Sequence, residues 1–331
     1  MALKGKRRKK AQDEADVALL QSVADEPTHA RRKRLGKTLV ILSRKRSLYS
    51  TSRLVQAARA RGHRALVLDT LRCNLILEPG LARMTFRGVE VRGIDAVIPR
   101  IGASVTHYGL AVVNHFQMMG VPVVNGTAGI AQSRDKLRAL QVLAGQGIDV
   151  PRTVMARDRK NIRALLQEVG GLPAIIKLLR GTQGVGVMIA SSLAEVQGIL
   201  DTFSALDQDI VLQEFVKESR GRDIRALVVG DRVVGAMRRQ ARKGEFRSNI
   251  HRGGSGRPIE LPPAWAKAAL KAARALSLEV CGVDMLEAES GPKVMEVNSS
   301  PGFEGLEKAT GLDVAGAIVE HAAALASRSS A

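Results

Sequence analysis

Two short runs near the carboxyl end of the chain decide the fold: CGVDMLEA at residues 281–288 and KVMEVN at residues 293–298. Both are mostly apolar and flank a turn-forming Ser-Gly pair, so they predict a β-hairpin. Glu296 and Asn298 are two residues apart, and their side chains therefore project from one face of the strand. Pairing around the turn places Asp284 about opposite Glu296.

Facing carboxylates in apolar surroundings repel each other, and a divalent cation between them removes this repulsion. Asp284, Glu296 and Asn298 offer only oxygen ligands, which suit Mg²⁺ or Mn²⁺ better than zinc. The alternative is a solvent-facing strand that carries scattered acids. The Asn, the register and the apolar neighbours together favour a metal site.

Upstream of this hairpin, the first part of the chain alternates between strand-like and helix-like segments. Strands are predicted at 38–43, 65–69, 95–100 and 121–125, with helices at 52–62 and near 108–119. This alternation predicts a small parallel sheet covered on both faces.

Strands dominate the rest of the chain. They are predicted at 174–179, 187–190, 210–216, 223–229 and 232–238, with helices at 129–147, 161–169, 192–203 and 264–278 and a terminal Ala-rich helix. The fold class is therefore α/β plus α+β. We expect a basic disordered tail at 1–36, an α/β domain at 37–125, a central subdomain at 126–209 and a carboxyl-terminal subdomain at 210–331.

The chain is strongly basic, with a formal charge of +19 over 331 residues, of which the tail carries +5. Such a field attracts nucleic acid, ribosomes, nucleotides or acidic peptides, and charge alone does not choose among them. Cys73 and Cys281 stand far apart in no metal-ligand spacing, which indicates a reducing compartment. Without an apolar run long enough to span a bilayer, we expect a cytoplasmic protein with no membrane contact.

A glycine-rich segment, GTQGVG at residues 181–186, lies between two predicted strands. It is neither a Walker loop nor a Rossmann turn, because no Gly-Lys-Ser/Thr follows and the chain continues as strand. Gly184 and its neighbours could instead let backbone N–H groups approach a triphosphate, although flexible hairpin loops are common. Lys177 interrupts the preceding apolar strand and Lys136 opens a helix, so each is a phosphate ligand or an ordinary surface lysine.

Two further segments carry polar groups suited to a nucleotide. Glu214 and Phe215 end an apolar strand where an adenine could bind, and Asp223 opens the next strand. The segment FRSNIHRGG at residues 246–254 is a Gly-rich loop that contains Arg247, Ser248 and Asn249. Positive charge and positioning are what phosphoryl transfer requires. A generic basic turn or a nucleic-acid contact is the other interpretation.

The order of these features resembles the ATP-grasp ligases, and more narrowly the RimK-type alpha-L-glutamate ligases. The narrow likeness lies in ILSR at 41–44, AVIPRIG at 96–102, the segment 246–254 and MEVNSSPG at 295–302. It implies an ATP-grasp fold with an amino-terminal Rossmann-like pre-ATP-grasp domain. It also implies that the following residues bind the nucleotide: Lys136, Lys177, Gly184, Glu214, Phe215, Asp223, Arg247, Ser248 and Asn249.

The same resemblance implies a reaction and its partners. Two Mg²⁺ or Mn²⁺ ions would bind at Asp284, Glu296 and Asn298, with Arg247 and Asn249 as catalytic residues. ATP would activate the carboxyl terminus of a small-subunit ribosomal protein as an acylphosphate, and the amino group of L-glutamate would attack it. A basic body suits such an acidic acceptor tail, and the family pattern favours a homo-oligomer.

Some features lie outside that pattern. Arg180 stands where family members usually carry an acid, and the basic tail suggests contact with the ribosome or RNA. Arg44, Tyr49 and Arg100 are the candidates for the amino-acid pocket. Two alternatives stay open: a ligase for a small molecule or an amino-group carrier protein, and a basic RNA-binding protein that retains the fold. A protein kinase is excluded by the lack of His-Arg-Asp and Asp-Phe-Gly segments.

Overall fold

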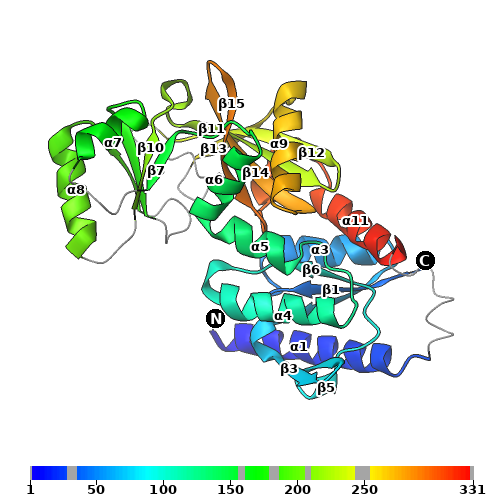
Figure 1. The fold of residues 1–331 in the computed structure, drawn as a ribbon. Helices are drawn as coiled ribbons and strands as arrows, with labels where there is room; N and C mark the ends of the chain where they lie inside the picture. Colours follow the sequence, from blue (N-terminus) through cyan, green and yellow to red (C-terminus); the bar gives the residue numbers. More distant parts are fainter. Residues whose placement is uncertain are drawn as a thin grey trace.

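The computed structural model describes residues 2–27, 36–155, 161–178, 186–205, 210–242 and 254–328. Within these ranges the strands form four sheets, and Figure 1 shows how the helices cover them. No helix in the described ranges combines the length and the apolar character that crossing a membrane requires. The predicted loop residues Arg180, Gly184, Arg247, Ser248 and Asn249 lie outside the described residues.

The amino-terminal sheet is parallel and has the strand order β2-β1-β6. Its elements are β1 (Thr38–Leu42), α3 (Tyr49–Ala60), β2 (Arg64–Leu68), β6 (Ala96–Pro99) and α4 (Thr106–Met118). Alternate residues of β1 belong to different cores, Ile41 packing with Leu54 of α3 and Leu42 with Val112 of α4. A central strand covered on both faces must be apolar throughout, which confirms the predicted sheet.

The strand predicted at 121–125 is wrong, because Val123 makes only an isolated parallel bridge to Val97. Pro122 has no N–H to donate to a ladder. Asn125 then turns away from the sheet. Its buried side chain donates to the carbonyls of Val280 (2.7 Å) and Ser299 (2.8 Å), which ties the amino-terminal unit to the carboxyl-terminal sheet.

The stretch between β2 and β6 contains a small antiparallel sheet that the sequence analysis missed. Its strands are β3 (Cys73–Glu78), β4 (Leu81–Phe86) and β5 (Val89–Glu90), and the 3₁₀ turn η1 (Thr70–Arg72) leads into it. Charged and apolar residues are mixed along these strands, so only a few side chains, such as those of Met84 and Phe86, are buried. Because the alternation of apolar residues is weak, the sequence alone predicts a loop here.

The prediction of a disordered tail is wrong for the described part of residues 1–36. Helix α1 (Ala2–Ala24) lies along the amino-terminal unit, at the bottom of Figure 1. Leu20 and Val23 are buried, and Leu20 is part of the core beside β1 and α4. The high charge suggested disorder, but two apolar side chains and ion pairs to the domain compensate for the entropy lost on ordering.

Asp16 is the buried anchor of this helix. Its carboxylate accepts two hydrogen bonds from Nη1 of Arg46 (2.6 and 2.7 Å) and one from the backbone N–H of Val67 (3.3 Å). One turn earlier, Asp13 accepts from Arg72 (3.1 Å) and Arg87 (2.8 Å). The acids in the middle of α1 are therefore neutralised by arginines of the domain.

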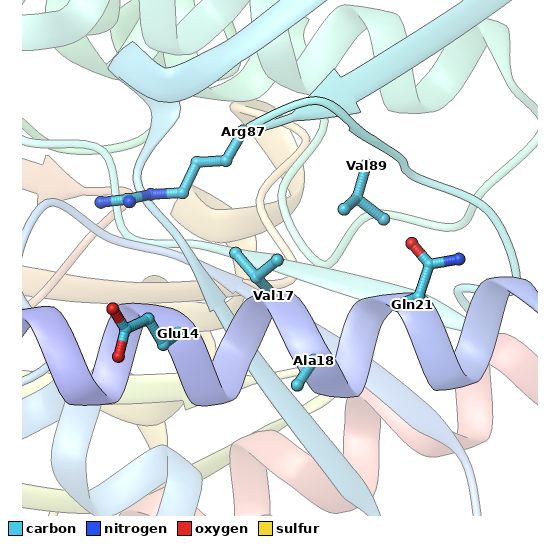
Figure 2. A pocket seen from close by; sticks show the side chains of 6 residues that line it. All are labelled: Glu14, Val17, Ala18, Gln21, Arg87 and Val89. Carbon is cyan, nitrogen blue, oxygen red and sulfur yellow. The ribbon is translucent and has the colours of Figure 1, made fainter.

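A shallow cavity of about 390 Å³ lies between α1 and β5. Figure 2 shows its lining side chains, which are Glu14, Val17, Ala18, Gln21, Arg87 and Val89. None of the residues that the sequence analysis assigned to chemistry lines it. The cavity is therefore a consequence of the docking of α1 and holds none of the candidate site residues.

The helix predicted at 129–147 is two helices, α5 (Thr127–Arg134) and α6 (Lys136–Gly145). Asp135 separates them because its backbone is extended (ψ 102°) and its side chain caps α6 by accepting from the N–H of Arg138. Leu143 of α6 packs in the same core as Leu276 and Val297. Although we expected this helix in the central subdomain, it packs with the carboxyl-terminal sheet.

The central unit has an antiparallel sheet in the order β7-β10-β8-β9, at the left of Figure 1. Its elements are β7 (Thr153–Met155), α7 (Ile162–Glu168), β8 (Ala174–Leu178), β9 (Val187–Ala190), α8 (Leu193–Ala205) and β10 (Ile210–Glu214). Its core is separate from the others and is formed by apolar residues of both helices and the sheet, Ile176 and Leu212 among them.

The carboxyl-terminal sheet has five antiparallel strands in the order β13-β12-β11-β14-β15. Its elements are β11 (Arg222–Val229), β12 (Arg232–Gln240), β13 (Ser255–Pro258), α9 (Pro263–Ala275), β14 (Val280–Ala288) and β15 (Gly291–Asn298), followed by α10 (Glu304–Thr310) and α11 (Val314–Arg328). One face of this sheet shares a core with α3 and β1 through Phe303 and α11. Residues of the amino-terminal sheet and of the carboxyl-terminal sheet therefore belong to one buried core.

Candidate active site

The hairpin of β14 and β15 pairs as the sequence predicted, since Asp284 stands opposite Glu296. A β-bulge produces this register. The pairs nearer the turn, such as Met285 with Val294, would place Met295 opposite Asp284 if they continued unbroken, but the register shifts at this point. Bulges re-aim side chains in this way, and here Asp284, Glu296 and the Asn298 two residues on share one end of the hairpin.

Asp284 is buried among arginines. Arg225 donates to both of its carboxylate oxygens, from Nε (2.7 Å) and from Nη2 (2.6 Å). Nη2 of Arg239 lies 3.0 Å from the Oδ2 atom of Asp284, and the same guanidinium binds both oxygens of Asp223 (2.5 and 2.7 Å). We call these four residues, Asp223, Arg225, Arg239 and Asp284, the paired cluster.

The electrostatics of the paired cluster favour the ionised form of Asp284. Burial alone would raise the pKa of Asp284, but Arg225 and Arg239 hold that pKa below its ordinary value. Burial likewise opposes the charge of Arg239, yet Asp284 and Asp223 raise its pKa above the usual range. Asp223, which we expected at the nucleotide, thus lies in a buried ion pair next to the predicted metal ligand.

The hairpin fits a Mg²⁺ ion in its donor chemistry. Oδ1 of Asp284 accepts one hydrogen bond and so keeps a free lone pair, while Glu296 and Asn298 add two further oxygen ligands. Within the described ranges, no group of three or more His, Cys, Asp or Glu side chains is placed to hold a metal. A cation here would therefore depend on Asn298 and on oxygens brought by a substrate.

Lys177 of β8 reaches the same region from the central unit. Its Nζ donates to Oε1 of Gln213 on the neighbouring strand β10 (2.5 Å). Burial lowers the pKa of Lys177 to about 8, the charge of Glu296 opposes this shift, and the positive charge of Lys136 adds to it. Lys177 of β8 therefore lies within electrostatic range of Lys136 of α6 and of Glu296 of β15.

Such an arrangement suits phosphate oxygens and a metal ion. The lysines repel each other, and an anion between them would relieve this repulsion. The structure thus brings together Lys136, Lys177 and Glu296, which the sequence analysis had assigned to one site from separate segments.

Glu214 and Phe215, the residues predicted to contact the nucleoside, lie at the end of β10. Burial opposes the charge of Glu214, but the backbone N–H of Arg152 (3.0 Å) and the ammonium of Lys293 (3.2 Å) hold its pKa below the ordinary value. Phe215 follows directly and is half-buried. Their roles at a nucleotide stay predictions.

Two candidates for the amino-acid pocket are committed to other contacts. Nε of Arg44 lies 2.9 Å from the carboxylate of Asp69. The hydroxyl of Tyr49 donates to Glu307 (2.7 Å), which also accepts from Arg53. The first contact joins the segments that follow β1 and β2, and the second joins α3 to α10.

Arg100, the third candidate, is different, and it has a neighbour that the sequence analysis did not single out. Arg100 follows β6 and donates to the carbonyl of Pro301 (2.7 Å), and Arg134 ends α5 and donates to the carbonyl of Ile101. Neither guanidinium forms an ion pair with a carboxylate in the part of the chain that the structure describes. The only signal for Arg134 was its place beside Lys136. We call Arg100 and Arg134 the open pair.

Comparison with known proteins gives two family matches that cover most of the described chain. Residues 38–130 match the family described as RimK PreATP-grasp domain, and residues 133–322 match the RimK-like ATP-grasp domain. Helix α1 precedes both matched segments.

Curated relatives match at about half identity over most of their length. A probable alpha-L-glutamate ligase of Pseudoalteromonas translucida (strain TAC 125) is 50% identical over 280 residues, covering 85% of this chain and 93% of the relative. A probable alpha-L-glutamate ligase of Teredinibacter turnerae (strain ATCC 39867 / T7901) is 52% identical over 282 residues, covering 85% and 94%.

Among solved structures, the ATP-grasp ligase PsnB complexed with minimal precursor, Mg and ADP has a similar fold. Its TM-score is 0.70 at 23% identity, and the match covers 88% of this chain and 98% of that one. The pre-ATP-grasp and ATP-grasp architecture expected from the sequence is thereby confirmed.

Proposed function

This chain belongs to the RimK-type family of ATP-grasp enzymes, which are ATP-dependent carboxylate–amine ligases, and from that premise we propose that it adds L-glutamate to the C-terminal carboxylate of a small-subunit ribosomal protein. The observation that carries the proposal is the convergence of Lys136, Lys177 and Glu296, with Asp284 opposite Glu296 in the hairpin. In the proposal these groups would supply cations for phosphate oxygens and carboxylates for a metal ion.

The proposed reaction has two steps. A carboxylate oxygen of the acceptor attacks the γ-phosphorus of ATP, the bond from phosphorus to the β–γ bridging oxygen breaks, and ADP leaves. The amino nitrogen of glutamate then attacks the carbonyl carbon of the acylphosphate. The new C–N bond forms as phosphate departs, and the nitrogen loses its extra proton to solvent.

The residues of the chain divide this work by chemistry. Lys136 and Lys177 would neutralise phosphate oxygens, and Glu214 with Phe215 would hold the nucleoside. Asp284, Glu296 and Asn298 would hold two Mg²⁺ or Mn²⁺ ions, which neutralise the transferring phosphoryl group when bound. Arg247, Ser248 and Asn249, with the glycine-rich loop around Gly184, complete the proposal from outside the described residues.

The charge distribution supports an acidic protein acceptor. The chain carries a formal charge of +19, so a glutamate-rich tail is attracted to it and gains charge with each addition. We extend the proposal to ribosome or RNA contact through the basic first turns of α1, which hold Lys4, Lys6, Arg7, Arg8, Lys9 and Lys10. Because Leu20 belongs to the core, the test is replacement of these six residues by Gln, not deletion of the helix. Unchanged co-sedimentation with ribosomes at low salt would remove this extension.

Mass spectrometry of the acceptor tests the main proposal. The ribosomal protein is incubated with the full chain, ATP, Mg²⁺ and glutamate, and its carboxyl terminus should gain the mass of glutamyl residues. Glu296→Gln should reduce the rate about 1000-fold, since a metal contributes several kcal/mol to such a reaction. Glu289→Gln, in the exposed turn of the same hairpin, is the matched control and should stay near wild type. Glutamate transfer only to free amino acids or to a carrier protein would contradict the ribosomal acceptor.

A further inference from the structure

The open pair occupies the boundary between the amino-terminal unit and the end of β15. Nη2 of Arg100 donates to the carbonyl of Pro301 (2.7 Å), and its guanidinium carbon lies 5.7 Å from the centre of the Phe303 ring. Arg134 donates to the carbonyl of Ile101, the residue after Arg100. Backbone carbonyls thus fix both side chains, and the Phe303 ring adds a contact to Arg100. These contacts leave most of the guanidinium N–H donors available.

The two charges of the open pair repel each other, and neither forms an ion pair with a carboxylate of the described residues. Burial lowers the pKa of Arg100 to about 10, and repulsion from Arg134 contributes to that shift. Burial also lowers the pKa of Arg134, with the charge of Glu296 opposing it. Two guanidinium groups that repel each other in a desolvated place cost free energy, whereas the arginines of the paired cluster each meet a carboxylate.

Three buried polar atoms, one in Arg134 and two in the segment that follows β15, have no hydrogen-bond partner among the described residues. Nε of Arg134 is buried and donates to no group among the described residues, and the same holds for the hydroxyls of Ser299 and Ser300. Ser300 is close to Arg100, since its carbonyl lies 3.5 Å from Nη2 of that residue. Buried donors are nearly always paired in folded proteins, so unpaired ones in Arg134 and in Ser300, whose backbone contacts Arg100, favour a ligand site here.

The open pair lies close to the proposed reaction centre. Arg134 interacts with Glu296, the same carboxylate that interacts with Lys177. In the proposed function the ATP phosphates already have Lys136 and Lys177 as partners. The carboxylates of the acceptor and of glutamate still need binding partners on the protein. Guanidinium groups bind carboxylates in a planar, two-point geometry.

We propose that Arg100 and Arg134, with the hydroxyl of Ser300, form the binding site for a substrate carboxylate beside the metal site, an inference that rests on the proposed function. The carboxylate comes from one of two sources, the incoming glutamate or the C-terminal residue of the acceptor. In either case a ligand with a neutral amide at that position loses the charge that the open pair needs. Binding of the carboxylate would remove the repulsion between the two arginines.

Titration calorimetry with the full chain tests this site apart from turnover. Wild type is titrated with L-glutamate and, separately, with an acidic peptide that ends in a free carboxylate. Arg134→Gln should weaken the binding of one of these ligands about 100-fold, which is the order of effect of removing one partner of a buried charge pair. The ligand that is affected identifies the source of the carboxylate.

Two further variants keep the result interpretable. Arg134→Lys retains the charge but lacks the planar guanidinium group, so it should recover part of the affinity. It also replaces Arg134→Gln as the test variant if Arg134→Gln does not fold. Arg83→Gln removes an exposed arginine that pairs with Glu78, and it should bind both ligands as wild type does. Steady-state kinetics should show the same pattern, with KM raised for one carboxylate substrate and KM for ATP within about threefold.

The inference is overturned if wild type binds neither ligand, or if Arg134→Gln binds both as tightly as wild type. A general weakening that includes ATP would also overturn it, because that pattern shows structural damage. If mass spectrometry shows no glutamate addition while Arg134→Gln still loses the binding of one ligand, the proposed function fails and the carboxylate site stands.

Discussion

Two groups of arginines in this protein differ in what neutralises them. Arg225 and Arg239 of the paired cluster meet Asp284 and Asp223 at 2.5–3.0 Å inside the carboxyl-terminal sheet. Arg100 and Arg134 of the open pair donate hydrogen bonds to backbone carbonyls and repel each other. Neither forms an ion pair with a carboxylate in the described ranges. The charges of the first group are neutralised by carboxylates of the chain itself. The charges of the second group remain available to an anionic ligand.

A neutralised cluster fixes the position of Asp284 and stabilises the sheet, so its loss should affect folding. An uncompensated pair destabilises the free protein and becomes favourable only with an anion bound. Stability lost at a binding site in this way is a common cost of function. The two groups should therefore respond in opposite ways to the same type of mutation.

The largest effect is expected for Arg239→Met in the paired cluster. This change removes the guanidinium that binds Asp223 and also contacts Asp284, and Arg225 still binds Asp284. The free energy of unfolding should fall by about 3–5 kcal/mol. Urea denaturation of the full chain measures it. Arg238→Met is the control on the same strand, because Arg238 forms a surface ion pair with Glu287 and should contribute at most about 1 kcal/mol. A loss below 1 kcal/mol for Arg239→Met would break the comparison.

Asp16 extends the comparison to α1, since it neutralises Arg46 from a helix outside the family match. Asp16→Ala should cost about 1–3 kcal/mol, because Arg46 and the N–H of Val67 lose a buried partner. Burial raises the pKa of Asp16, so part of the ion-pair energy is already offset in the wild type. Protease sensitivity of residues 2–24 measures the release of α1, with the exposed Asp25→Ala as control. Equal resistance in both variants would show that the apolar contacts alone hold the helix.

Lys177 gives a pH prediction with a definite sign. Burial lowers its pKa to about 8 in the free protein, so the ammonium that would bind phosphate is lost as the pH rises above that value. ATP affinity should fall by up to about tenfold per pH unit above 8, as linkage requires. The stability of the free protein should change in the opposite direction. In the unfolded chain this lysine stays charged up to its ordinary pKa of 10.5, so the free energy of unfolding should rise between pH 8 and 10.5 as the buried charge is lost. Calorimetric titration with ATP from pH 7.5 to 9.5 measures the first effect, and Lys177→Met should give a flat profile.

The smallest effect is expected for Arg134→Met in the open pair. In the absence of ligands the free energy of unfolding should stay within about 1 kcal/mol of wild type or rise, because an uncompensated buried charge is replaced by an apolar side chain. The measurement is urea denaturation beside Arg239→Met. A loss as large as that of Arg239→Met would show that Arg134 is structural, and the contrast between the two groups would disappear.

Much of the fold followed from patterns within single segments. The central strand at Thr38–Leu42, the helix at Pro263–Ala275 and the terminal hairpin each carry a strong apolar period, and each was predicted nearly to its ends. The weakly patterned strands at Cys73–Glu78 and Leu81–Phe86 were missed, because few of their side chains are buried. Helix α1 was mistaken for disorder, because the arginines that neutralise its acids lie 30 to 74 residues away in the chain.

The candidate site divides in the same way. The spacing of Glu296 and Asn298, the turn that brings Asp284 near them, and the lysines beside predicted phosphate positions were determined by the sequence itself, since side-chain period and turn chemistry are local. Tertiary structure alone decided the bulge that sets Asp284 against Glu296, the arginines that surround Asp284, and the meeting of Arg100 with Arg134. Those features depend on contacts between distant segments, and the free energy of a buried charge is fixed only when all the groups around it are in place.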